Sequence, residues 1–183
     1  MQQTHTMFPG LSVWKRGHFL TFLLAVSLLM SLTAPKAAAM QASSSFEATF
    51  AGTFQITEDV GNSPVFVVQE AGSGDEQTFG DFTYTTYLLQ NLARIPPGCG
   101  RSSSTGVGGS AELSFADGVI NLRRISGTVC FAFPNINVEE SWVIASGTGN
   151  YAGATGTLSR QLVGNVISGV SSGMISGTIN LVD

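Results

Sequence analysis

Histidine and lysine occur only in the first 39 residues of this chain, so residues 40–183 contain neither. A Ser-His-Asp or Cys-His catalytic arrangement and a lysine Schiff base are therefore excluded from that part of the chain. A metal site with histidine ligands is excluded as well. General acid–base chemistry would fall to carboxylates, tyrosines or water held by arginine. The sequence accordingly indicates no catalytic residue, metal or cofactor. It favours a protein that is not an enzyme, and an enzyme is the alternative.

Basic residues are also scarce. Residues 40–183 carry all twelve acidic residues of the chain but only five basic ones, namely Arg94, Arg101, Arg123, Arg124 and Arg160. Nucleic acids and anionic lipid surfaces are bound by basic faces. We therefore expect no nucleic-acid partner.

The first 39 residues are typical of an export signal. Lys15 and Arg16 precede an apolar run at residues 19–32, and three alanines at 37–39 form an A-x-A-type cleavage site. The run is shorter than the about 20 residues that a membrane span needs. We expect cleavage near Ala39, no stable membrane anchor afterwards, and a secreted or periplasmic single domain at residues 40–183. A retained anchor is the alternative, and either Met1 or Met7 can be the true start.

Two cysteines are present, Cys99 and Cys130. In an exported chain an isolated pair predicts one disulfide, with two unpaired thiols as the alternative. Residues 94–109 form the longest expected connection, and Pro96-Pro97-Gly98 prevents regular strand pairing there. The disulfide would pin this connection to a strand.

The rest of residues 40–183 consists of short alternating runs between turns rich in Gly, Ser and Asn. In the first run, Phe46, Ala48 and Phe50 alternate with polar residues, as in a half-buried antiparallel strand. Counting such runs gives about eight strands, the number that closes a small barrel. The predicted fold is therefore all-β, an antiparallel closed barrel of about eight strands.

Two local features refine this prediction. Asp117-Gly118 is a favoured two-residue hairpin turn, which would set Phe115 opposite Ile120. The adjacent acids Glu58-Asp59 and Asp75-Glu76 are expected to lie in turns and to be solvated.

The apolar residues change parity between Leu122 and Ile125, where Ile125 begins a new core-facing series. A slip of one residue swaps the faces of a strand, so an interruption is required. A β-bulge at Arg123-Arg124 would leave both guanidinium groups near solvent. The alternative is two strands with a kink at Gly127.

Glu140 is the carboxylate most suited to a site. Strand alternation places it on the same face as Trp142 and Phe131, and a buried carboxylate needs a partner. Arg160, between two leucines on the next strand, is the expected partner. Glu140, Arg160, Trp142 and Phe131 are therefore the candidate ligand-binding residues. In the alternative, Glu140 lies at the barrel mouth and is simply hydrated.

The segment SGTGNYAGATGT at residues 146–157 contains the letters of a dinucleotide-binding motif. That motif must open a helix and be followed by an acid about 20 residues later, and neither is present. The glycines at 147, 149, 153 and 156 instead predict a tight loop with positive φ values, with Tyr151 as an aromatic plug. The segment resembles the GGTGxFxGAxG turn of the dirigent and allene oxide cyclase group of calycin-like barrels.

This resemblance implies a barrel, and it leaves three hypotheses for function. The first is non-catalytic binding of a small apolar ligand or of a protein partner. The second, implied by the resemblance, is a barrel that steers cyclisation or coupling of a reactive intermediate. The third is an extracellular structural or self-associating protein. The oligomeric state stays open.

Overall fold

The computed structural model describes residues 41–59 and 63–182, so the predicted export signal lies outside the described residues. The described residues form eight strands and one 3₁₀ turn. They are β1 (Gln41–Asp59), β2 (Val65–Glu76), β3 (Gly80–Asn91), β4 (Ser104–Phe115), β5 (Gly118–Ala132), β6 (Asn135–Gly147), η1 (Gly149–Tyr151), β7 (Thr155–Asn165) and β8 (Val170–Val182).

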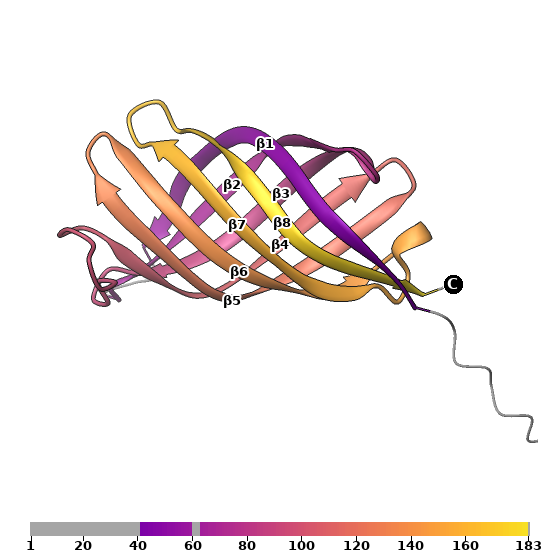
Figure 1. The fold of residues 1–183 in the computed structure, drawn as a ribbon. Coiled ribbons are helices and arrows are strands. Elements are labelled where there is room, and N and C mark those ends of the chain that lie inside the picture. Colours follow the sequence, from indigo (N-terminus) through magenta and orange to yellow (C-terminus); the bar gives the residue numbers. More distant parts are fainter. Residues whose placement is uncertain (1–40, 60–62, 183) are drawn as a thin grey trace, which may run out of the picture. The chain divides into compact units, whose positions relative to one another are not determined.

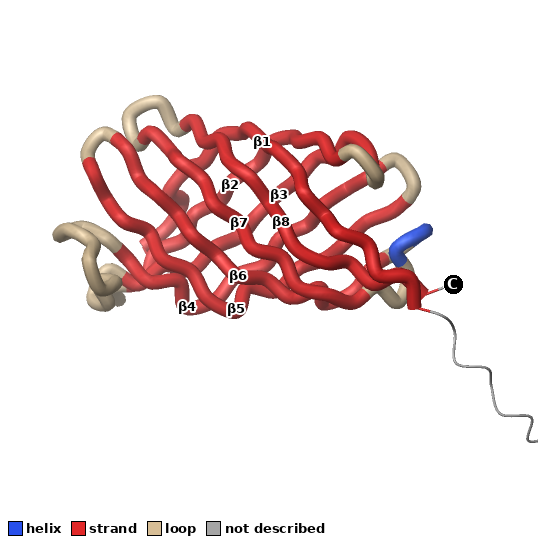
Figure 2. The backbone as a smooth tube through the Cα atoms, in the orientation of Figure 1, coloured by secondary structure: helices blue, strands red, loops and turns tan. Residues whose placement is uncertain are grey.

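Each strand pairs antiparallel with the next, and β1 also pairs with β8, which closes the barrel (Figure 1). The predicted all-β closed barrel of eight strands is therefore confirmed. Strands make up most of the described backbone (Figure 2). Among the described residues, no helix has the length and apolar character to cross a bilayer.

Alternation decides which side chains face the barrel interior. Phe82, Tyr84 and Leu88 of β3 are buried, whereas Thr83, Thr85 and Tyr87 between them are exposed. The same period-two pattern recurs in β6 and β7, and such alternation fills the interior with one set of side chains.

Aromatic side chains close one end of the barrel, where the β2–β3 and β4–β5 turns and η1 lie (Figure 1). The ring of Tyr151 lies 5.0 Å from that of Phe115 and 6.0 Å from that of Phe79. Phe46 packs on both phenylalanines. We call this the closed end.

Tyr151 is the plug expected from the glycine-rich segment. Its hydroxyl donates a 2.8 Å hydrogen bond to Asp117 in the β4–β5 turn. Gly149 has φ +59°, and a Cβ there would lie 2.1 Å from the carbonyl oxygen of Asp117, so the position requires glycine. Gly153 and Gly156 also have positive φ values, but Gly147 does not, which corrects that part of the prediction. Gly147 is needed for space, because a Cβ would lie 2.0 Å from the Tyr151 carbonyl oxygen.

Three local predictions were wrong in detail. Phe115 pairs with Gly118 rather than with Ile120, because the hairpin loop is Ala116-Asp117; the shift of two residues preserves the faces. The long connection ends at Ser103, since β4 already begins at Ser104. The acidic pairs Glu58-Asp59 and Asp75-Glu76 lie at the ends of β1 and β2 rather than in turns. Glu76 is also buried, because its carboxylate accepts the N–H groups of Thr78 and Phe79 and so holds the β2–β3 turn.

The β-bulge in β5 is confirmed, but its consequence was predicted wrongly. Arg124 pairs with Trp142 and Ser126 with Ser141, which leaves Ile125 as the bulged residue. Ile125 is therefore exposed instead of facing the core. Arg123 points to solvent, but Arg124 keeps the inward parity of Leu122 and is only 5% exposed. A buried guanidinium requires partners, and these lie in the interior.

Candidate functional site

A cavity of about 430 Å³ occupies the opposite end of the barrel, which we call the open end. Side chains from the seven strands β1 to β7 and from three connections line it, and most of them are apolar. The lining residues are Phe54, Ile56, Ser63, Pro64, Phe66, Val68, Glu70, Leu88, Gln90, Leu92, Ser102, Ser104, Val129, Phe131, Ile136, Val138, Arg160, Leu162 and Val166. We call this the open-end cavity.

Two of these lining residues, Glu70 and Arg160, belong to a set of four buried charged groups that we call the charged network. Its members are Glu70 on β2, Arg124 on β5, Glu140 on β6 and Arg160 on β7. Each of the four side chains faces inward on its strand, so all of them lie in the barrel interior. Glu140 is also the direct cross-strand partner of Arg160.

Ion pairs join the four groups into a chain in the order Arg124, Glu140, Arg160 and Glu70. Nη1 of Arg124 lies 2.7 Å from Oε1 of Glu140, and Nη2 of Arg160 lies 2.8 Å from Oε2 of Glu70. Nε of Arg160 lies 2.9 Å from Oε2 of Glu140, although the N–H is not directed at that oxygen and neither atom makes a hydrogen bond. The network thus contains two positive and two negative groups, which balance.

Arg124 also binds the backbone. Its Nη2 donates to the carbonyl oxygens of Leu89 and Gly108 on the neighbouring strands β3 and β4. A Cβ at Gly106 would lie 2.6 Å from Cζ of Arg124, so glycine there makes room for the guanidinium. Burial lowers the pKa of Arg124, and the Glu140 carboxylate offsets part of that effect.

Glu70 is held from the other side by two hydroxyl groups. Oε1 accepts a 3.0 Å hydrogen bond from Tyr84 and a 2.6 Å bond from Ser171. Burial and the adjacent Glu70 carboxylate raise the pKa of Tyr84, which keeps the phenol neutral and donating. Burial alone would lower the pKa of Arg160, but the carboxylates of Glu140 and Glu70 outweigh it and raise that pKa.

Alkaline solution should weaken the barrel. The pKa values of Tyr84 and Tyr151 are both raised from 10.0, by burial first and then by Glu70 and Asp117 respectively. A raised pKa contributes stability that is complete below pH 10 and is lost as the pH rises through the folded-state pKa. We expect urea midpoints to fall between pH 10 and 11, and the fall to be shallower in Tyr84→Phe. Equal pH dependence in both proteins would contradict this assignment.

The sequence located two members of the network. Glu140 and Arg160 meet on the interior face as expected, and Glu140 is 3% exposed, which excludes the hydrated alternative. Phe131 lines the open-end cavity, whereas Trp142 is buried in the core and does not line the cavity.

Glu70 and Arg124 were missed. Glu70 lies in the middle of β2, which runs to Glu76. The alternation of Phe66, Val68 and Glu70, all of which line the cavity, was the available signal. For Arg124 the signal was its shared parity with Leu122.

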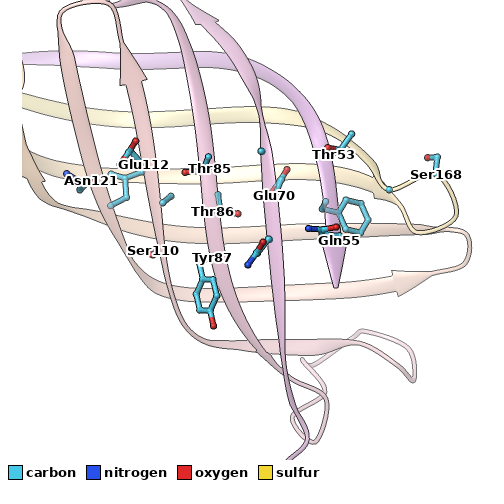
Figure 3. Close-up of a pocket in the computed structure, with 16 residues that line it drawn as sticks. Thr53, Gln55, Glu70, Thr85, Thr86, Tyr87, Ser110, Glu112, Asn121 and Ser168 are labelled. Carbon is cyan, nitrogen blue, oxygen red and sulfur yellow. The ribbon is translucent and has the colours of Figure 1, made fainter. Parts of the chain in front are cut away.

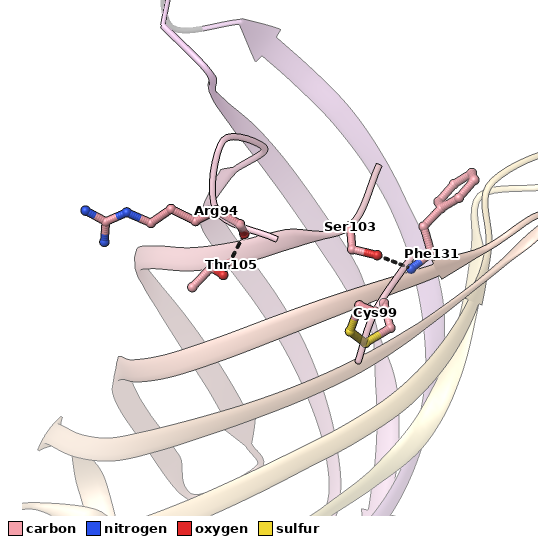
Figure 4. The surroundings of a disulfide bond; sticks show 6 residues. Arg94, Cys99, Ser103, Thr105 and Phe131 are labelled. Atoms are coloured by element: carbon pink, nitrogen blue, oxygen red, sulfur yellow. Dashed lines mark hydrogen bonds between the residues drawn. A yellow bond between two sulfur atoms is a disulfide. The ribbon is translucent and has the colours of Figure 1, made fainter. Parts of the chain in front are cut away.

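The disulfide predicted between Cys99 and Cys130 is confirmed, with Cα atoms 5.1 Å apart. It fixes the β3–β4 loop beside the open-end cavity (Figure 4). The hydroxyl of Ser103 accepts the N–H of Phe131 at 2.9 Å, which adds a second tie. Leu92 and Ser102 at the ends of this loop contribute to the cavity lining, so the disulfide holds part of the cavity wall.

A second hollow of about 720 Å³ lies on the outer face of the barrel over β1 to β5 (Figure 3). Outward side chains such as Gln55, Gln69, Tyr87 and Glu112 line it. These four side chains are exposed, and none of them belongs to the charged network. Across residues 41–59 and 63–182, no three His, Cys, Asp or Glu side chains cluster closely enough to hold a metal ion.

No known protein family and no curated protein sequence matches this chain. A solved structure described as a nonspecific heme-binding cyclase that catalyses a cycloaddition during neoabyssomicin biosynthesis is similar over 97% of this chain and 84% of that one. The sequence identity is 11% and the TM-score is 0.38, and a likeness at that level carries no argument about activity. The dirigent and allene oxide cyclase resemblance is not confirmed by these comparisons.

Proposed function

We propose that the protein is an exported carrier or receptor that binds a small, largely apolar molecule in the open-end cavity. The cavity itself is the observation that supports this proposal most. Its volume of about 430 Å³ lies in the range of roughly 300–1,000 Å³ that is typical of small-molecule sites. Apolar walls with a few polar groups at one end are the usual composition of such sites.

The two halves of the barrel differ in a way that favours ligand binding over a purely structural role. Aromatic rings fill the closed end, where Phe82 and Phe115 lie 5.4 Å apart. Beyond the charged network the interior is not filled. Apolar side chains around the open end, including Ile56 and Leu92, remain exposed. A ligand that covers such surface gains about 25 cal/mol per Å².

Filling the cavity should abolish binding. Val138 lines the cavity opposite Val129 on the neighbouring strand, so Val138→Phe places a ring inside it. With N-phenyl-1-naphthylamine as a neutral fluorescent probe, we expect wild-type protein to bind and Val138→Phe to bind at least about tenfold more weakly, a loss of about 1.4 kcal/mol. Val163→Phe is the matched control, because Val163 is exposed on the outer face of β7.

Melting temperatures identify any variant that fails to fold. Equal probe affinity in folded wild-type and Val138→Phe proteins would place the probe elsewhere and reject the cavity as the site. Probe binding lost in Val163→Phe but kept in Val138→Phe would point to the outer surface instead.

The cyclase-like alternative would use the same cavity, with Glu70 and Arg160 as the polar groups that meet the substrate. Both groups already carry buried ion-pair partners, which favours binding over proton transfer. A role outside the cytoplasm is supported by the Cys99–Cys130 disulfide, since such bonds persist in oxidising compartments.

A further inference from the structure

We propose that the floor of the open-end cavity selects an uncharged, hydrogen-bonding head group, so that the ligand is a neutral amphiphile such as a long-chain alcohol or amide. This inference rests on the proposed function and specifies its ligand class. Glu70 and Arg160 are the charged residues that line the cavity, and both are buried.

The charged network is electrically balanced. Glu70 and Glu140 supply two negative charges, and Arg124 and Arg160 supply two positive charges. A ligand carboxylate or ammonium entering this site would add a charge that has no counterpart. Apolar walls surround it, and an unpaired charge in such surroundings is strongly disfavoured. A neutral ligand leaves the balance intact.

The floor nevertheless retains capacity for hydrogen bonds. A carboxylate offers about four lone-pair positions, and Glu70 uses three of them, for Tyr84, Ser171 and Arg160. Arg160 engages its partners through Nη2 and Nε, and Nη1 takes part in none of these contacts. The remaining acceptor position is on Glu70 and the donor nitrogen is Nη1 of Arg160, and both residues line the cavity. A hydroxyl or carboxamide group can both donate and accept, and so matches them.

The other polar side chains in the cavity wall are uncharged. Gln90 and Ser104 lie on adjacent strands, and the Ser104 hydroxyl donates to the Gln90 carbonyl oxygen at 3.5 Å. Ser63 and Ser102 also line the cavity. Within the described lining there is no further cationic or anionic group to compensate a charged ligand.

Four probes with the same ten-carbon chain separate the head group from the apolar body. Decane, decanol, decanoate and decylammonium would compete with N-phenyl-1-naphthylamine for protein comprising residues 40–183, which include every strand of the barrel. We expect decanol to bind at least as tightly as decane. We expect it to bind at least about tenfold more tightly than either charged probe at pH 7.

A change of one charge should alter this preference. Glu70→Gln keeps the shape of the side chain but gives the network a net positive charge, so the decanoate affinity relative to decanol should rise by roughly tenfold. Glu76→Gln is the matched control, because Glu76 is a buried carboxylate outside the charged network that holds the β2–β3 turn and does not line the cavity. Its ratio should equal that of the wild type.

Each outcome bears on the proposal. Decanoate or decylammonium binding as tightly as decanol would overturn the head-group selection, while cavity binding as such would stand. Decanol binding about tenfold more weakly than decane would also overturn it, because the hydroxyl would then lose its water bonds without replacement. Binding of no probe at all would reject both the proposed function and this inference. If Glu70→Gln does not fold, the wild-type series alone decides.

Discussion

Replacing Glu140 by alanine should lower the free energy of unfolding by about 3–5 kcal/mol, because removing one partner leaves buried charges without compensation. Glu140 is the central member of the charged network and touches both arginines. The substitution would strand Arg124, which loses its ion-pair partner, and would leave Arg160 with Glu70 alone.

Urea denaturation of residues 40–183 measures this effect. The control is Glu139→Ala, which removes the exposed neighbouring carboxylate on the same strand and should change stability by no more than about 0.5 kcal/mol. In the double variant Glu140→Ala/Arg160→Ala, the combined loss should be smaller than the sum of the two single losses, because the residues are in contact. Equal stabilities of the Glu140→Ala and Glu139→Ala proteins would show that the network does not form.

Removing the disulfide should cost about 3–4 kcal/mol, because the bond links positions separated by 31 residues in the sequence. It should also weaken binding in the open-end cavity. Cys99 lies in the β3–β4 loop, and residues at both ends of that loop contribute to the cavity lining. Loss of the covalent tie leaves the Ser103–Phe131 hydrogen bond to hold the loop against β5.

The double variant Cys99→Ala/Cys130→Ala and the wild type, each with and without dithiothreitol, make a matched set. Reduction should lower the stability and probe affinity of the wild type to those of the variant, and it should not affect the variant. Wild-type protein whose stability is unchanged after complete reduction would contradict the stabilising role. Unchanged probe affinity would separate the loop from the cavity.

Strand parity made much of the fold predictable from the sequence. Alternation in β1 identified its inward face, and consecutive strands placed Glu140 opposite Arg160. The cysteine pair and the plug role of Tyr151 followed from residue type and turn chemistry. These features depend on residues that are close in the sequence or lie on adjacent strands, and such relations can be inferred from one amino-acid sequence.

The remainder of the charged network depends on contacts between distant strands. Glu70 and Arg160 are 90 residues apart, and no local pattern specifies that they meet. The bulge was predicted, but the side of β5 that each residue faces can be assigned only when the bulged residue is known. Because that residue is Ile125, Arg124 retains the inward direction. The size of the open-end cavity was likewise unpredictable, since it depends on how far side chains fill a closed barrel.

The most direct test of ligand binding in the open-end cavity is a two-dimensional amide NMR titration of residues 40–183 with decanol. We predict chemical-shift changes concentrated at cavity-lining positions such as Phe131, Val138 and Leu162, with the amides around Tyr87 and Glu112 on the outer face unchanged. Changes centred on that outer face, or no change up to the solubility limit of decanol, would contradict it.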